Sequence, residues 1–427
     1  MRIAITNWSR RRAGGVETYL AGIVPELVRA NHSVAFWHEV DEPTGRERIL
    51  LPEGVPGWCL SDLGSERAVA ALRDWQPDVI YGHGLLDAKL EAETLKIAPA
   101  VFFAHSYYGT CISGAKAFKS PAVRPCSRRF GWQCLLHYFP HRCGGWSPTT
   151  MMREYRIQSR RLEILSGYRA VVTHSDHMRS EYLQHGLAAD RVYKLSYYAY
   201  NAGNSADLAK KFQAFSTSPL TIQDSLAVDG SLTTTRNTPH WRLLFLGRMD
   251  FLKGGGVFID ALPEVRASLD RTLRVTFAGD GLDRGSWERK ARRVQALSGG
   301  SQIEFVGWLN SSQRDSLLAD CDLLVLPSLW PEPFGQVGIE AGVHGVPVAA
   351  FAVGGIREWL IDGVNGYLAP GDPPTAAGLA DAIIRCLRDP TTHAHLCRVA
   401  MEMAQHFKVG EHLGELVKVF EKVLRHE

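Results

Sequence analysis

The sequence predicts an α/β protein made of two Rossmann-like domains, each built on a doubly wound parallel sheet. The chain has 427 residues, more than one ordinary hydrophobic core accommodates, so two domains are expected. In each half, short apolar runs alternate with longer helical patterns, as in parallel sheets covered by helices. Between the halves, residues 201–240 are rich in Ser, Thr, Asn and Asp, and we expect a linker or insertion there.

The first domain is expected over residues 1–200. Arg2-Ile3-Ala4-Ile5-Thr6 predicts a buried strand, and a loop with Gly14 and Gly15 separates it from a helix over about 16–29. Further apolar runs predict strands at 33–38, 78–81, 100–105, 169–173 and 191–197.

The second domain is expected over residues 241–390. Its strands are predicted at 241–246, 274–277, 303–306, 323–326 and 348–351. Each is followed by glycine or proline and then by a helical pattern. The last segment, 391–427, is predicted to be helical and amphipathic.

Composition is that of a globular protein, and the formal net charge of +3 does not indicate nucleic-acid binding. The longest apolar run, Val346 to Val353, is too short for a membrane span and contains Pro347. The first strand leads directly into Arg10-Arg11-Arg12, without the apolar core of a signal peptide, so a cytoplasmic protein is expected.

Two glutamates, Glu332 and Glu340, lie eight positions apart around a turn that is predicted to open a helix near Gly335. The free N–H groups at such a helix start favour an anion. Glu332 can accept hydrogen bonds from sugar hydroxyls, and Glu340 can accept from a second pair such as those of ribose. The spacing therefore suits a sugar nucleotide, whereas the alternative is a surface loop with an incidental glutamate.

Two cations, Arg248 and Lys253, follow the first predicted strand of the second domain. A guanidinium fork and an ammonium group together suit a leaving diphosphate. In the first domain, Gly14 and Gly15 precede a helix and would let backbone N–H groups approach a phosphate. The alternative for the two cations is an ordinary solvent-facing pair.

These motifs resemble those of retaining glycosyltransferases of the GT-B architecture, particularly family 4. Pro331 to Ala341 resembles the family's E-x7-E motif, Leu246 to Gly255 its G-R-x4-K-G loop, and Gly14-Gly15-Val16-Glu17 its glycine-rich turn. Three further segments follow in the family's order: Val306-Gly307-Trp308-Leu309, Leu326-Pro327-Ser328 and Gly354-Gly355-Ile356-Arg357-Glu358. The resemblance is dense over 241–390 and thinner over 1–200.

The resemblance implies that the two domains face each other across a cleft, with the last helix returning to the first domain. It implies transfer of a sugar from a UDP- or GDP-type donor to a hydroxyl acceptor, with retention of configuration and no cofactor or metal. The catalytic candidates are Arg248, Lys253, Glu332 and His105. The donor-binding candidates are Gly14, Gly15, Gly247, Gly307, Trp308, Leu309, Phe334, Gly335, Gln336, Val337 and Glu340.

His105 ends a predicted strand, and the family's equivalent histidine lies near the reacting sugar. His83, at the end of another strand, is a weaker candidate of the same kind. A structural role is the alternative for both, because histidines at strand ends are often structural.

The stretch 106–161 is expected to be an insert of the first domain, on the acceptor side. It carries one acid, Glu154, against Lys116, Lys119, Arg124, Arg128, Arg129, Arg142, Arg153, Arg156, Arg160 and Arg161. Aromatic residues lie between them: Phe118, Phe130, Trp132, Tyr138, Phe139 and Trp146. Such a patch suits a lipid-linked or otherwise anionic acceptor and peripheral membrane contact, while a solvated face is the alternative.

Four cysteines lie in the same insert: Cys111, Cys126, Cys134 and Cys143. Their spacings are wider than those of ordinary zinc sites, so a structural metal is a weak candidate beside free or transiently oxidised thiols.

The sequence also leaves other functions open. The acceptor could instead be a soluble small molecule or natural product. Gly279-Asp280-Gly281 after a strand suggests a nicotinamide-dependent oxidoreductase, although the spacing to Gly285 is one residue too long. A catalytically silent partner subunit is a third alternative. Asp320-Cys321-Asp322 fits a D-x-D string but lies before a strand, so we interpret it as structural.

Overall fold

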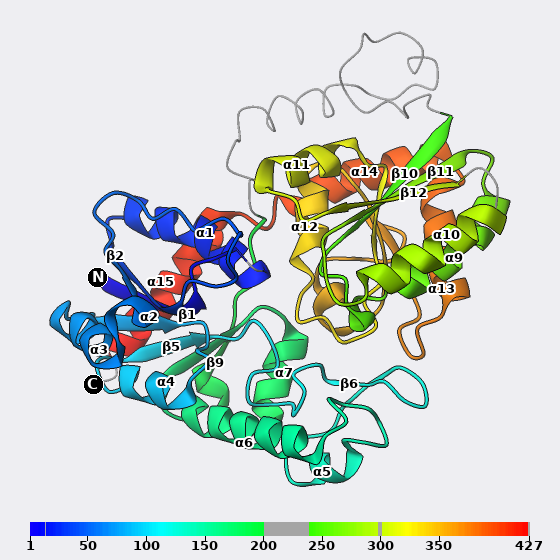
Figure 1. Ribbon diagram of the computed structural model, residues 1–427. Coiled ribbons are helices and arrows are strands. Elements are labelled where there is room, and N and C mark those ends of the chain that lie inside the picture. The colour runs from blue at the N-terminus through cyan, green and yellow to red at the C-terminus, as the bar shows by residue number, and fades with distance from the viewer. Residues whose placement is uncertain (13, 200–238, 298–300, 426–427) are drawn as a thin grey trace. The chain divides into compact units, whose positions relative to one another are not determined.

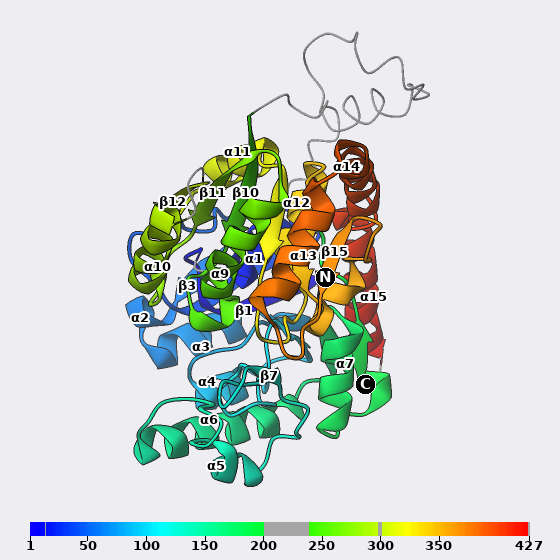
Figure 2. The same ribbon diagram turned by 90° about the vertical axis from the view of Figure 1, so that its right-hand side faces the viewer.

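The computed structural model describes residues 1–12, 14–199, 239–297 and 301–425. The chain forms two compact units (Figures 1 and 2): unit 1 contains residues 1–200 and 409–427, and unit 2 contains residues 201–408. The stretch 201–240, for which a linker or insertion was predicted, lies outside the described residues except for its last two positions.

Unit 1 is built on a seven-stranded sheet of order β3-β2-β1-β4-β5-β8-β9, in which all neighbouring strands are parallel. These strands are β1 (Arg2–Ser9), β2 (Ser33–Val40), β3 (Gly57–Cys59), β4 (Val79–Gly82), β5 (Ala100–Phe103), β8 (Ala170–Thr173) and β9 (Val192–Lys194). The central strands are buried along most of their length because helices cover both faces of a doubly wound sheet.

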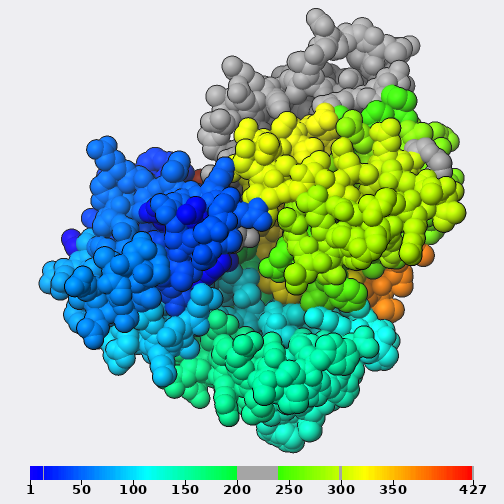
Figure 3. Space-filling model, in the orientation of Figure 1, coloured from blue at the N-terminus to red at the C-terminus, as the bar shows by residue number. Residues whose placement is uncertain are grey.

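The helices of unit 1 are α1 (Gly15–Arg29), α2 (Leu60–Leu63), α3 (Ser65–Asp74), α4 (Ala88–Thr94), α5 (Gln133–His137), α6 (Pro148–Leu165), α7 (Asp176–Gln184), the 3-10 turn η1 (Ala189–Arg191) and α15 (Val409–Arg425). A short antiparallel pair, β6 (Ala117–Phe118) and β7 (Arg124–Pro125), lies in the insert. The insert forms one continuous surface region, cyan to green in Figure 3.

The C-terminal helix α15 packs against α1 and β5 of unit 1. Its buried residues Leu416, Val419, Phe420 and Val423 follow helical spacing and form one apolar face. His412 Nε2 lies 2.8 Å from the hydroxyl of Tyr19 on α1. The expected single helical segment over 391–427 is two helices, of which α14 belongs to unit 2.

Unit 2 is built on a six-stranded parallel sheet of order β12-β11-β10-β13-β14-β15. Its strands are β10 (His240–Leu246), β11 (Thr272–Ala278), β12 (Ser301–Gly307), β13 (Leu323–Leu326), β14 (Val348–Phe351) and β15 (Gly366–Ala369). Its helices are η3 (Phe251–Lys253), α9 (Gly255–Ser268), α10 (Arg284–Leu297), α11 (Ser311–Asp320), α12 (Gln336–Val343), η4 (Gly354–Glu358), α13 (Ala376–Leu387) and α14 (Pro390–Ala404).

The predicted fold class, two Rossmann-like α/β units, is confirmed, and every predicted strand is present with ends shifted by at most a few residues. The prediction missed the short strands β3, β6, β7 and β15. In the described part of the chain, no helix is long and apolar enough to cross a membrane.

Candidate functional site

The candidate site of unit 2 lies where the strand order of its sheet reverses. β10 has β11 on one side and β13 on the other, so the loops after β10 and β13 leave the sheet in opposite directions. In open α/β sheets this switch point, at the carboxyl ends of the strands, is where ligands bind. Lys253 follows β10 and Glu332 follows β13, so both candidate residues border this point.

Lys253 ends the 3-10 turn η3, whose start is capped by Asp250. The next residue, Gly254, has a φ of +73°, and a Cβ there would lie 1.8 Å from the carbonyl oxygen of Pro327. Only glycine allows this close approach of the two loops. The glycine of the Lys-Gly pair therefore brings Lys253 next to the loop that carries Glu332.

Three donors converge on one oxygen of Glu332. Its Oε1 lies 2.5 Å from Lys253 Nζ and accepts hydrogen bonds from the Ser328 hydroxyl, at 2.6 Å, and the Trp330 indole, at 3.0 Å. Its backbone oxygen accepts from the amide of Gly355, at 2.7 Å. No described residue donates to Oε2, so this oxygen of a rigidly held carboxylate is available to a ligand.

The second glutamate, Glu340, lies inside α12, which begins after Gly335 as predicted. Its side chain is almost fully buried, and its Oε2 lies 3.6 Å from a guanidinium nitrogen of Arg314 on α11. At the start of α12, the side-chain amide nitrogen of Gln336, Nε2, is buried without a hydrogen-bond partner among the described residues. A buried amide without an acceptor is costly, so a ligand oxygen at this helix start would satisfy it.

The other predicted donor-site residues differ in their exposure and in their contacts. Arg248 is highly exposed, and its Nε lies 2.6 Å from Asp250 Oδ2, so a phosphate would have to replace Asp250 as its partner. Such an exchange costs little because exposed ion pairs contribute little stability. Trp308 is exposed at the end of β12, whereas Phe334 is buried and gives its backbone oxygen to the Trp359 indole, at 2.6 Å. Phe334 therefore contributes to packing. Of the remaining candidates, Gly247 directly follows β10, Gly307 is the last residue of β12, Leu309 lies in the loop after β12, and Val337 lies in the first turn of α12.

Gly279 and Gly281 have a packing role. A Cβ on Gly279 would lie 1.9 Å from the carbonyl oxygen of Gly247, so the loops after β10 and β11 touch through their backbones. This contact accounts for the glycines without a nicotinamide cofactor. Asp320 and Asp322 both pair with Arg242, at 2.6 and 2.7 Å, as expected of a structural D-x-D string.

In unit 1, the candidate phosphate loop joins β1 to α1. Gly14 is the N-cap of α1 and is exposed, as is Gly15. A Cβ on Gly14 would approach only Glu17, at 3.8 Å, so packing within the chain does not require glycine there. Glu17 is itself buried and accepts from the Trp8 indole, at 2.9 Å. Its position indicates a structural role, and open space remains in front of Gly14.

His105 lies in a buried chain of hydrogen bonds at the carboxyl ends of β4 and β5. Its Nε2 lies 2.7 Å from His83 Nδ1, and its Nδ1 is bonded to the hydroxyl of Tyr197. Both ring nitrogens of the predicted catalytic histidine are thus occupied. His83 Nε2 is buried and has no partner among the described residues, so it is the end of this hydrogen-bond series that can still bind another group.

Burial keeps these histidines neutral. It lowers the pKa of His83 and of His174 to about 3 and that of His412 to about 4, and it also lowers the pKa of His105 well below its usual value, with His83 adding to the effect. A network of neutral rings can donate at one end and accept at the other, depending on the tautomers.

Acid should destabilise unit 1 through these histidines. In the unfolded chain they bind protons below about pH 6.5, whereas in the folded protein they stay neutral until about pH 4. Within this window stability falls as pH falls, by up to about 1.4 kcal/mol per pH unit for each histidine. Urea denaturation at about pH 7 and pH 5 measures the effect.

The exposed His395 of unit 2 provides the control. His412→Phe should reduce the difference between the two pH values, while His395→Gln should leave it unchanged. Equal midpoints for the wild-type protein at both pH values would contradict the expectation.

The structure corrects the predicted basic, aromatic patch of the insert. Phe130, Tyr138 and Cys143 are buried with Ile112 in a small core of the insert, against which Phe118 and Phe139 pack. Lys116 is also buried, with its Nζ 2.5 Å from Glu181 Oε1 on α7. Of the six aromatic residues, only Trp132 and Trp146 are exposed, at 62% and 70%. Most of the rings serve the insert's own core because a segment away from the main sheet must bury apolar surface of its own.

The geometry gives no support to a metal site at the cysteines. Among the described residues, no group of three or more His, Cys, Asp or Glu side chains could hold a metal ion, and Cys111, Cys126, Cys134 and Cys143 are free thiols. Burial raises the pKa of Cys126 and Cys134, and that of Cys143 to about 12. Such thiols resist the deprotonation that metal binding requires.

Comparison with known proteins identifies the family. Residues 13–195 match Glycosyltransferase Family 4, and residues 240–389 match Glycosyl transferases group 1, so both units are matched. The chain belongs to the family 4 group of GT-B glycosyltransferases. The family 4 resemblance predicted from the motifs is thereby confirmed.

Individual relatives of this family 4 protein match in part. Glycogen synthase of Mycobacterium tuberculosis is 36% identical over 161 residues, which are 38% of this chain and 37% of the synthase. Phosphatidyl-myo-inositol mannosyltransferase of Mycobacterium leprae is 29% identical over 226 residues, 51% of this chain and 58% of the relative. The chain thus spans less than two thirds of each relative. Alr3699/HepE of Anabaena, crystallised with UDP and glucose, has the same fold, with a TM-score of 0.65 at 20% identity over 99% of this chain and 100% of that one.

Sequence reasoning missed several residues of the site. Trp330 and Arg314 contact Glu332 and Glu340 but belong to no motif that we recognised, and Tyr197 was assigned only to a strand. Ser328 was part of the Leu-Pro-Ser match, which gave its place in the chain but not its contact with Glu332.

Proposed function

We propose that this protein is a retaining glycosyltransferase that moves a sugar from a UDP- or GDP-type donor to a hydroxyl acceptor, without a metal cofactor. Convergence of Lys253, Ser328 and Trp330 on Glu332 is the observation that carries the proposal. It leaves a rigid carboxylate oxygen for a sugar hydroxyl beside an ammonium group for a diphosphate. The complex of the structurally similar Anabaena protein with UDP supports a nucleotide-sugar donor.

The residues divide the work of the transfer. Lys253 and Arg248 would neutralise the charge that grows on the diphosphate as the glycosidic bond breaks. Glu332 would bind and orient the donor sugar, while Glu340 and the side-chain amide of Gln336 would bind the nucleotide. Attack on the same face as the departing diphosphate, with the acceptor's proton passing to that diphosphate, gives retention. Positive side chains and helix N-termini supply the stabilisation for which other transferases use a divalent ion.

We propose an acceptor from polysaccharide, glycolipid or glycoconjugate biosynthesis. The relatives' names support this class, because one is a glycogen synthase and another a phosphatidyl-myo-inositol mannosyltransferase. For a lipid-linked acceptor, the exposed Trp132 and Trp146 of the insert would make peripheral contact with the membrane. Flotation with anionic vesicles tests this contact, and no loss of binding in a Trp132→Ala, Trp146→Ala double variant would contradict it.

The test of the function is a donor screen that records nucleotide release, followed by nuclear magnetic resonance of the fresh product. We expect turnover of one or more UDP- or GDP-sugars, a product with the donor's anomeric configuration, and activity that survives a chelator. An inverted product would contradict the retaining mechanism, and complete loss of activity in chelator would contradict metal independence.

Glu340→Ala should weaken nucleotide binding. A hydrogen bond from a ribose hydroxyl to a carboxylate contributes roughly 1.5–3 kcal/mol, so loss of one such bond should lower UDP affinity by about 10-fold to 100-fold. Isothermal titration calorimetry measures it. The control is Glu264→Ala, an exposed glutamate on α9 of the same unit. Equal UDP affinity in the Glu340→Ala variant and the wild-type protein would remove Glu340 from the site.

A further inference from the structure

An arginine-rich surface lies at the carboxyl ends of β1 and β2 in unit 1. Arg10, Arg11 and Arg12 follow β1, and Arg46 and Arg48 follow β2. The two loops are joined by backbone hydrogen bonds, from Arg12 N to Glu47 O at 2.8 Å and from Ile49 N to Arg10 O at 2.9 Å. These bonds fix the arginines relative to one another on the ligand-binding edge of the sheet.

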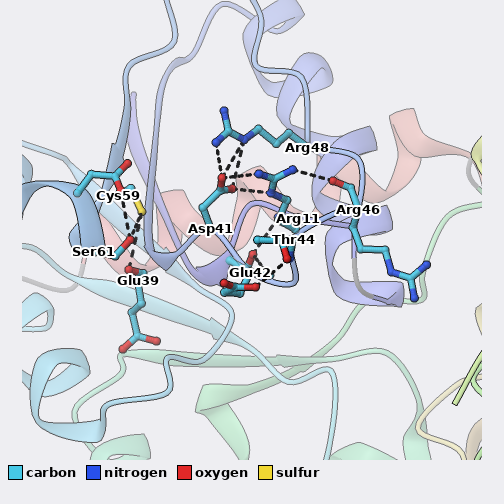
Figure 4. Close-up of polar contacts among 11 residues, drawn as sticks. Arg11, Glu39, Asp41, Glu42, Thr44, Arg46, Arg48, Cys59 and Ser61 are labelled. Atoms are coloured by element: carbon cyan, nitrogen blue, oxygen red, sulfur yellow. Dashed lines mark hydrogen bonds and ion pairs between the residues drawn. The ribbon is translucent and has the colours of Figure 1, made fainter. Parts of the chain in front are cut away.

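Two of these arginines share a single carboxylate. Arg11 donates from Nε and Nη2 to Asp41, at 2.9 and 2.6 Å, and Arg48 donates to the same carboxylate from Nε, at 3.0 Å, and from Nη2 (Figure 4). Arg11 also donates to the backbone oxygen of Arg46, at 2.9 Å. The single negative charge of Asp41 therefore faces the two positive charges of Arg11 and Arg48, so these three side chains together carry a net charge of +1.

A third guanidinium, that of Arg10, adds to this excess. Arg10 is half-buried, and its Nε is buried with no hydrogen-bond acceptor among the described residues. Burial and the charge of Arg48 lower its pKa, whereas Arg48 and Arg11 lower the pKa of Asp41 to about 2. Burial, with Arg10 adding, lowers the pKa of the neighbouring His38 to about 4. In all three cases the contribution of the neighbouring arginines has the direction expected of a positive local potential.

A buried guanidinium nitrogen without an acceptor is costly, and a doubly charged oxyanion bound to the Arg10 side chain would relieve that cost. Guanidinium groups bind phosphate through paired N–H donors, which a single ammonium group does not provide. The surface lies after β1, in the same loop as Gly14, but its donors are side chains, so it differs from the backbone site at the start of α1.

We propose that Arg10, Arg11 and Arg48 form a binding subsite for a phosphate group of the acceptor. The assignment to the acceptor rests on the proposed transferase function, whereas phosphate binding itself does not. The subsite would select phosphorylated acceptors over neutral ones, and it would place the acceptor on unit 1.

The first experiment measures thermal unfolding with inorganic phosphate against chloride of equal ionic strength. It uses the full chain carrying Lys253→Ala, so that phosphate binding at the donor site is weakened. At a concentration about ten times its dissociation constant, phosphate should raise the Tm by roughly 3 °C. Arg10→Gln should abolish the shift, Arg10→Lys should keep part of it, and Arg29→Gln, an exposed arginine on α1, should leave it unchanged.

Arg48→Gln is a second variant that is expected to fold normally, because Arg48 is more exposed than Arg11 and its loss leaves the Arg11–Asp41 pair intact. It should reduce the shift without abolishing it. A phosphate shift that is as large in Arg10→Gln as in the parent protein, or no shift in the parent protein, would overturn the proposal.

The second experiment identifies the source of the phosphate by the same Tm measurement. One arm uses glucose 6-phosphate with glucose as its control, and the other uses dihexanoyl phosphatidylinositol with dihexanoylglycerol as its control. A shift that depends on Arg10 in the first arm assigns a sugar phosphate, and one in the second arm assigns a lipid headgroup. UDP binding by the wild-type protein is measured alongside. If UDP binds but phosphate does not, the phosphate subsite is refuted and the transferase function stands. If phosphate binds but UDP does not, the transferase function is refuted and the phosphate subsite stands.

Discussion

Lys253→Ala should lower kcat by about 100-fold to 1000-fold while leaving the fold intact. The ammonium group stabilises charge that develops on the diphosphate mainly in the transition state, and loss of one such group costs about 2.7–4 kcal/mol in comparable sites. Affinity for the donor should change less than kcat, because the charge that is added to the diphosphate as the bond breaks makes its contact with Lys253 stronger in the transition state than in the bound donor. Steady-state kinetics with the donor found in the screen measures both quantities.

Lys290→Ala is the matched control for this lysine. Lys290 lies in the same unit, and its Nζ pairs with Asp260, at 2.5 Å, on the exposed faces of α10 and α9. It should keep wild-type kcat. Wild-type kcat in Lys253→Ala, with unchanged circular dichroism, would refute the assignment of Lys253 to the diphosphate.

Glu332 should have the second large effect, and two substitutions separate its roles. Glu332→Ala removes the acceptor of Ser328 and Trp330 and leaves Lys253 unpaired, so we expect activity to fall by at least about 100-fold and stability by about 1–3 kcal/mol. Glu332→Gln keeps an oxygen for the hydroxyl and the indole but loses the charge that fixes Lys253. It should restore stability while activity stays low.

Transfer kinetics and urea denaturation of both variants provide the measurement. Glu402→Gln, which alters an exposed ion pair with Arg398 on α14, should change neither quantity. Full activity in Glu332→Gln would show that the carboxylate charge is dispensable, and the site would need a different explanation.

The sequence contained enough to place Lys253 and Glu332 near each other, although 79 positions separate them. Apolar runs predicted β10 and β13, and in a doubly wound sheet the strands on either side of the switch point carry neighbouring loops. The convergence of three donors on one oxygen was not predictable in this way. It depends on the path of the Pro327–Pro333 loop, which follows from the contact between Gly254 and Pro327 rather than from any local pattern.

For the insert, the prediction that its aromatic rings lie on the surface was wrong for most of them. Alternation of basic and aromatic residues was taken for a surface patch because nothing in the local spacing distinguishes a ring that points outward from one that packs inward. The structure buries Tyr138 against Glu154, whose Oε2 accepts from the tyrosine hydroxyl at 2.7 Å. Only contacts among segments distant in the sequence decide which rings are buried.

His105 shows the same limit at a single residue. Its place at a strand end could be predicted, but its partner Tyr197 lies 92 positions away. Neither the hydrogen bond to Tyr197 nor the one to His83 has a sequence signal. A catalytic role for His105 would require exchange of one of these bonds for a substrate contact, and the open nitrogen of His83 offers an alternative.

The position of α15 has a consequence for how the chain is made. Residues 1–200 of unit 1 precede unit 2 in the chain, but the core of unit 1 includes Leu416, Phe420 and Val423, which leave the ribosome only after all of unit 2. Domains usually complete folding in the order of synthesis. Here unit 2 can complete its fold first. The sheet of unit 1 is synthesised earlier, but the helix α15 that packs on it follows about two hundred residues later. During translation, the apolar surface that α15 will cover is therefore exposed to chaperones.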